Sequence, residues 1–99
     1  MKLESPIQAD GRWRRNPDVH AREFDGELII LDLQQGEYYA LDAVGTQMWK
    51  HLVDGRSPAE IASVLQPEYK VEEAMLLKDV LVLLNELRAR HLVVRCEGP

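Results

Sequence analysis

The spacing of apolar residues changes once along this chain, near Asp42. Before that point, residues 19–24, 27–33 and 37–41 form short runs with the two-residue period or the β-branched content of strands. Asp25-Gly26 and Gln34-Gln35-Gly36 separate these runs, and both are tight-turn sequences. After Asp42 the apolar residues recur every three or four positions, as they do in helices. The change of period predicts an antiparallel meander of three strands followed by helices.

Three helices are predicted in the second half. Asp42 is a candidate N-cap for the first, which ends at Gly55. Residues 57–60, Ser-Pro-Ala-Glu, form a capping box for the second, which is expected to stop at Pro67. The third covers residues 72–90, and its apolar stripe consists of Leu76, Val80, Leu83, Leu84 and Leu87. Residues 92–94 are either a last short strand or a tail packed on the core. The predicted fold class is α+β, with a winged helix-turn-helix-like order of elements.

A chain of 99 residues is expected to form one domain. We place this domain at residues 19–95 and interpret residues 1–18 as a loosely attached N-terminal arm, with at most a short strand near Ile7. Four arginines stand at positions 12, 14, 15 and 22, against one acid at position 18. They are able to bind a phosphate or an acidic partner, although a solvated tail is the simpler interpretation.

Charge and hydropathy restrict the partners. The formal net charge is −5, and six acids lie between Glu23 and Asp42 without a lysine or arginine among them. Nucleic-acid-binding proteins usually carry a basic excess, so this balance opposes nucleic acid as a partner. No apolar run reaches the roughly 18 residues of a membrane span, and the first residues do not resemble a signal peptide. We therefore expect a cytoplasmic protein without a membrane partner.

No catalytic or metal-binding constellation is visible. None of the three histidines has a second ligand at metal-binding spacing, and the single cysteine, Cys96, has nothing near it in sequence that would activate its thiol. Phosphate-binding loops and nucleophile motifs are absent. We predict no catalytic residue, no metal and no cofactor. Asp79, beside the apolar stripe of the third helix, is either a surface carboxylate or a polar contact to a ligand.

The third strand has the character of an unprotected sheet edge. Residues 37–41 contain neither lysine nor proline, the residues that usually block edges. Tyr39 and Leu41 point to one face and Tyr38 and Ala40 to the other. Such a strand can accept a peptide as a fourth strand. The alternative is that residues 92–95 or the N-terminal arm cover this edge, and the pattern does not decide between the two.

Residues 19–94 resemble the PqqD-type leader-recognition proteins. The resemblance rests on an ordered series of short matches: Phe24-Asp25-Gly26-Glu27-Leu28, Leu31-Asp32, Gly36-Glu37-Tyr38-Tyr39-Ala40-Leu41-Asp42, Val44-Gly45, Met48-Trp49, Asp54-Gly55, Glu60-Ile61-Ala62, Leu65, Tyr69, Val71, Asp79-Val80, Leu83-Leu84 and Leu87. The family usually has Asn at the position of Asp42, and often Phe at Leu83 and Gly at His91.

The resemblance implies a non-catalytic adaptor that binds the leader of a ribosomally synthesised precursor peptide as an added strand. The adaptor then delivers the peptide to a maturation enzyme, and a separate leader peptidase of lasso-peptide biosynthesis is favoured. The alternatives are a peptide chaperone for a radical S-adenosylmethionine enzyme of the pyrroloquinoline quinone pathway, and a winged-helix DNA-binding protein. The implied peptide-binding residues lie on the third strand and the third helix: Glu37, Tyr38, Tyr39, Ala40, Leu41, Leu76, Asp79, Val80 and Leu83.

Overall fold

The computed structural model describes residues 7–96. Its strands form two antiparallel sheets, a three-stranded sheet in the order β2-β3-β4 and a two-stranded sheet of β1 and β5. The strands are β1 (Trp13–Arg15), β2 (Val19–Phe24), β3 (Glu27–Asp32), β4 (Glu37–Leu41) and β5 (Val93–Arg95). The predicted three-stranded meander is therefore confirmed.

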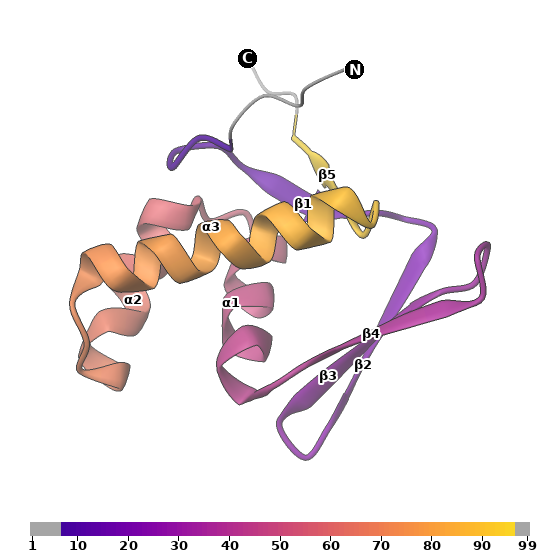
Figure 1. Ribbon diagram of the computed structural model, residues 1–99, viewed down its shortest axis with the longest axis horizontal. Helices are drawn as coiled ribbons and strands as arrows, with labels where there is room; N and C mark the ends of the chain where they lie inside the picture. Colours follow the sequence, from indigo (N-terminus) through magenta and orange to yellow (C-terminus); the bar gives the residue numbers. More distant parts are fainter. Residues whose placement is uncertain (1–6, 97–99) are drawn as a thin grey trace.

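Three helices follow β4 and lie beside the larger sheet, which projects away from them (Figure 1). They are α1 (Ala43–Val53), α2 (Pro58–Tyr69) and α3 (Glu73–Ala89). One apolar core lies between the inner face of the sheet and these helices, and its least exposed large side chains are Ile30, Ile61, Leu65, Leu84 and Leu87. The predicted α+β class is confirmed by this arrangement.

The turn between β2 and β3 consists of Asp25 and Gly26, with φ angles of 52° and 83°. Positive φ at both central residues is the mark of a type I′ turn, whose twist matches that of the flanking strands. Phe24 therefore pairs with Glu27 across the turn, and this pairing sets the register of the whole sheet. The sequence signal for this hairpin is confirmed.

A buried threonine joins the sheet to the first helix. Thr46 of α1 has no exposed surface. Its Oγ1 accepts a hydrogen bond from the Leu28 N–H at 3.0 Å and donates one to the Leu41 carbonyl oxygen at 3.3 Å. Asp42, the predicted N-cap, accepts a hydrogen bond from the Gly45 N–H at 2.8 Å. Together these bonds fix the direction in which the chain leaves β4 and enters α1.

The N-terminal arm is more firmly attached than its sequence suggests. Trp13 is only 6% exposed and belongs to the core, and β1 pairs with β5 through the partners Trp13 and Arg95. The expectation of a loosely attached arm is wrong for these residues, because a pairing between opposite ends of the chain leaves no local pattern. The expected strand near Ile7 is also wrong, since the strand begins at Trp13. Residues 1–6 of the arm lie outside the described residues, and the domain boundary at residue 19 stays a prediction.

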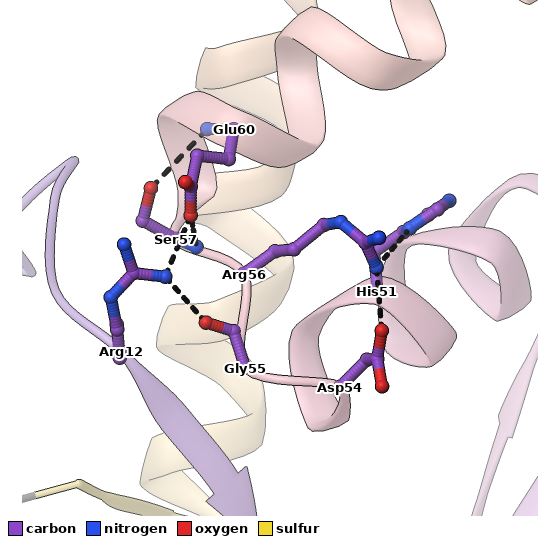
Figure 2. Close-up of polar contacts among 7 residues, drawn as sticks. All are labelled: Arg12, His51, Asp54, Gly55, Arg56, Ser57 and Glu60. Atoms are coloured by element: carbon purple, nitrogen blue, oxygen red, sulfur yellow. Dashed lines mark hydrogen bonds and ion pairs between the residues drawn. The ribbon is translucent and has the colours of Figure 1, made fainter.

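Polar contacts fasten the arm to the beginning of α2 (Figure 2). The Arg12 guanidinium donates to Glu60 Oε1 at 2.7 Å and to the Gly55 carbonyl oxygen at 2.5 Å. Glu60 also accepts from the Ser57 N–H, and Ser57 Oγ accepts from the Glu60 N–H, so the predicted capping box is confirmed. The hydrogen bond from Arg12, followed by the one from Ser57, lowers the pKa of Glu60 to about 2.

The second helix continues past Pro67, where we expected it to stop. It ends at Tyr69, and Lys70 caps it in the left-handed conformation with its N–H donating to the Gln66 carbonyl oxygen at 2.9 Å. A proline in a helix removes one backbone hydrogen bond. Here the loss falls in the last turn, and Tyr69 beyond it packs against the core. That packing offsets the missing bond.

Replacing Thr46 with valine tests the link between sheet and helix. The variant keeps the shape of the side chain but leaves a buried N–H and a buried carbonyl without a partner. We expect the free energy of unfolding to fall by about 2–6 kcal/mol, since two buried groups lose their partner and each costs about 1–3 kcal/mol. Urea denaturation measures this change. Thr46→Ser keeps the hydroxyl and serves as the control, with an expected loss below about 1.5 kcal/mol for one methyl group. Equal losses in the two variants would contradict the bridging role.

Candidate functional site

The outer edge of β4 has no strand partner within residues 7–96. The order of the larger sheet places β4 at an edge, and β5 pairs with β1 instead. Both possibilities for a covered edge, residues 92–95 and the described part of the arm, are therefore wrong. The edge of β4 is thus open to another strand, as its residue content indicated.

The register shows which backbone groups of β3 face β4. Residues that flank a type I′ turn exchange hydrogen bonds, so Phe24 and Glu27 are a hydrogen-bonded pair. Such pairs alternate along an antiparallel ladder, so the next residue, Leu28, directs its N–H away from β2. The bond from the Leu28 N–H to Thr46 agrees with this direction.

The same alternation shows which backbone groups of β4 point to its open edge. Ile30, two residues after Leu28, faces β4 and pairs with Tyr39. The N–H and C=O groups of Tyr39 are therefore used inside the sheet, whereas those of Tyr38 and Ala40 point to the open edge. The Tyr38 side chain lies on the outer face of the sheet and is 70% exposed.

One side of α3 runs along β4. Four of its residues stand three or four positions apart and so share a helix face: Asp79, Leu83, Glu86 and Arg90, the last being the C-cap. The Tyr39 Oη donates a hydrogen bond to Glu86 Oε2. The guanidinium carbon of Arg90 lies 4.8 Å from the centre of the Tyr39 ring. β4 and α3 thus form the two walls of a groove that Tyr39 crosses.

Two hollows lie along this groove, and Tyr39 is the residue that lines both. The hollow at the Leu41 end has a volume of about 290 Å³, and its lining includes Val44, Met48, Asp79 and Leu83. The hollow at the Glu37 end has a volume of about 210 Å³ and has a different lining: Ile30, Asp32, Gln35, Glu37, Tyr38, Tyr39, Ala89, Arg90, His91 and Leu92. The groove therefore offers apolar surface at both ends, with carboxylates at each end and the Arg90 cation at the second.

The environment of Tyr39 changes its acidity. Burial, followed by the hydrogen bond to Glu86, raises the pKa of Tyr39 to about 12, and the Arg90 cation opposes this shift. Both leading causes favour the neutral phenol. The phenol therefore remains a hydrogen-bond donor to Glu86 at neutral pH and holds its place across the groove.

The structure brings most of the predicted site residues together. Tyr39, Ala40, Leu41, Asp79 and Leu83 line the larger hollow, and Glu37 and Tyr38 line the smaller one. Leu76 and Val80 are only 3% and 2% exposed and line neither of these two hollows.

Sequence reasoning missed Val44 and Met48 on α1 and Glu86 and Arg90 on α3. The spacing of Glu86 and Arg90 from Asp79 and Leu83 was an available signal, since all four positions fall on one helix face.

Within the described residues, no group of three His, Cys, Asp or Glu side chains is placed to hold a metal ion. None of the helices in residues 7–96 has the length and apolar content to cross a membrane.

The comparisons with known proteins point to one family. The family model described as coenzyme PQQ synthesis protein D (PqqD) matches residues 27–93. A comparison with curated protein sequences gives no match.

Three solved structures share the fold. TbiB1, solved in complex with the TbiA(beta) leader peptide, is 30% identical with a TM-score of 0.78, over 86% of this chain and 99% of that one. A lasso peptide synthetase B1 complexed with the leader peptide is 29% identical with a TM-score of 0.78, over 84% and 98% of the two chains. The PqqD truncation of Methylobacterium extorquens PqqCD, a stand-alone RiPP recognition element, is 24% identical with a TM-score of 0.75, over 90% and 95%; at this identity it supports the fold alone.

A spectroscopic titration tests the contact between Tyr39 and Glu86. Because the folded-state pKa of Tyr39 lies near 12, above the ordinary value near 10, the neutral phenol contributes fully to stability below about pH 10. That contribution is lost as pH rises through about 12. In Glu86→Gln the acceptor carboxylate is gone, so the pKa of Tyr39 should fall toward 10 but stay above it, because burial remains. Phenolate absorbance during a pH titration measures the shift, and Tyr39→Phe identifies the signal of this residue. Unchanged titration curves in Glu86→Gln would show that the contact is absent in solution.

Proposed function

Since the chain belongs to the PqqD family, we propose that it is a recognition element for ribosomally synthesised and post-translationally modified peptides (RiPPs). It binds the leader segment of a precursor peptide as a strand added to β4, without catalysing a reaction itself. The observation that carries this proposal is the open edge of β4 beside the groove wall formed by α3.

The backbone of β4 supplies only part of the binding. The outward groups of Tyr38 and Ala40 offer two donors and two acceptors to an added strand. Ordering an extended peptide costs roughly 1–2 kcal/mol per residue, so these bonds need support from side-chain anchors. The larger hollow supplies that support, with Leu83 as the apolar contact on α3. Asp79 lines the same hollow and is suited to a basic residue of the leader.

The comparisons favour a lasso-peptide pathway. Two of the similar structures carry leader peptides, and one of these is a lasso peptide synthetase B1. We propose a separate leader peptidase in the cytosol as the maturation enzyme that receives the peptide. A radical S-adenosylmethionine enzyme of the pyrroloquinoline quinone pathway is the alternative, which the name of the family model supports.

Delivery requires a surface that remains free when the groove is occupied. The outer face of the larger sheet has this property, because Phe24 and Leu33 are each more than 60% exposed there or at its turns. Strand alternation places Arg22 and Glu27 on the same face as Phe24, so this face carries charges of both signs. It suits a maturation enzyme with an apolar surface.

A DNA-binding winged helix is the less favoured alternative. The order of elements fits a winged-helix interpretation in which the larger sheet is the wing. Two arginines of the basic arm are engaged within the fold, however. Arg12 pairs with Glu60, and Arg15 donates to the carbonyl oxygens of Asn16 and Val19.

Two proline variants test strand addition. Tyr38→Pro removes an N–H that points to the open edge, so the protein should stay folded and bind the leader at least tenfold more weakly. Tyr39→Pro removes an N–H used inside the sheet and should lower the thermal midpoint. Calorimetry with the leader half of a cognate precursor peptide measures binding, and circular dichroism measures folding. Normal leader binding by folded Tyr38→Pro would exclude this edge. Equal affinity for the leader and core halves would contradict selective recognition of the leader.

Leucine-to-alanine changes at neighbouring positions of α3 test the side-chain anchor. Leu83 is partly exposed and lines the larger hollow, whereas Leu84 is 1% exposed in the core. Leu83→Ala should weaken leader binding at least tenfold with little change in melting temperature, since an interface anchor is worth about 1–4 kcal/mol. Leu84→Ala is the control and should lower stability by about 2–5 kcal/mol. A large loss of stability in Leu83→Ala with unchanged affinity would place the anchor elsewhere.

A further inference from the structure

Tyr39 divides the groove at its middle. It is the central residue of β4, its Oη is bonded to Glu86, and Arg90 covers its ring. The two hollows lie on either side of it, and it belongs to the lining of both. A side chain that entered the groove at this point would meet a residue already held from two sides.

Strand geometry decides which leader residues face the groove. Residues that lie opposite each other in a sheet share a face. Tyr39 and Leu41 point toward the helices, so leader residues opposite Glu37, Tyr39 and Leu41 also point that way. The outer two of these stand four positions apart, which is about 13 Å along a strand. The leader residues opposite Glu37 and Leu41 therefore reach the two hollows, and the leader residue between them contacts Tyr39.

The two ends of the groove have space for side chains, whereas its middle does not. At the Leu41 end, Val44, Met48 and Leu83 provide an apolar wall, and the volume is about 290 Å³. At the Glu37 end the lining includes Ile30 and Leu92, and the volume is about 210 Å³. Each end has room for one large side chain, whereas the middle is filled by Tyr39.

We infer that this groove selects leaders in which a small residue (Gly, Ala or Ser) stands midway between two large side chains spaced four positions apart. Tyr39 is then a specificity-determining residue of the peptide site. The inference rests on the proposed function, and it adds the sequence pattern that the leader must carry.

The experiment uses a display library of random decapeptides as the probe. Peptides that bind the full chain are enriched, and the affinity of the tightest one is measured by fluorescence anisotropy. Enriched sequences should share the pattern large–any–small–any–large. Replacing the small residue of that peptide with leucine should weaken binding at least tenfold. With Tyr39→Ala, the same replacement should weaken binding by less than threefold, because the obstacle has been removed.

Matched variants separate this effect from damage to the fold. Phe24→Ala removes an aromatic side chain from the outer face, outside the lining of both hollows, and should keep the tenfold penalty. Glu86→Ala leaves Tyr39 in place but frees its hydroxyl, so the penalty should shrink even if Tyr39→Ala does not fold. Enriched peptides without a small middle residue, or a penalty unchanged in Glu86→Ala and in folded Tyr39→Ala, would overturn the inference while leaving the proposed function intact. Enrichment of no peptide at all would overturn both.

Discussion

The hydroxyl of Thr46 holds together the parts on which the groove depends. It stands between the Leu28 N–H and the Leu41 carbonyl, where two strands would otherwise bond directly. A side chain from α1 thereby bridges the last residue pair between β3 and β4. The position of α1 relative to β4 is set by this contact, and α1 supplies Val44 and Met48 to the larger hollow. The shape of that hollow therefore follows from a buried bond outside it.

The second constraint is the way in which the five strands pair. β5 follows α3 and passes close to the core, but it pairs with β1 and so leaves β4 open. The small sheet pairs the backbones of residues 13–15 and 93–95, whereas within the described residues the edge of β4 keeps donors and acceptors that no strand uses. Unused edges favour association, and most proteins block them. Here α3 lies beside the edge and forms the other wall of the groove.

Local signals account for most of what the sequence could predict. Asp25-Gly26, the Asp42 cap and the Ser57 capping box each act within a few residues, and the structure has all three. Long-range contacts account for what was missed. Nothing near Trp13 in sequence indicates its pairing with Arg95, and Pro67 stands in a helix because Tyr69 packs against the core beyond it.

The candidate site was predictable only in part for the same reason. Periodicity placed Val80 and Leu83 on one stripe of α3, but packing decides how a helix is rotated. Val80 turned to the core and Leu83 to the groove. The role of Tyr39 depends on Glu86, 47 positions away, which no pattern along the chain connects to it.

The pairing of β1 with β5 also determines how this unit can be joined to other proteins. Because Trp13 lies opposite Arg95, the chain enters and leaves the fold at neighbouring points. These points lie at the small sheet, whereas β4 belongs to the sheet that projects away from the helices (Figure 1). A domain fused at either end, or a fold that receives this unit as an insertion, would therefore be tethered through the small sheet. Such a tether would leave the edge of β4 on a different sheet from the point of attachment.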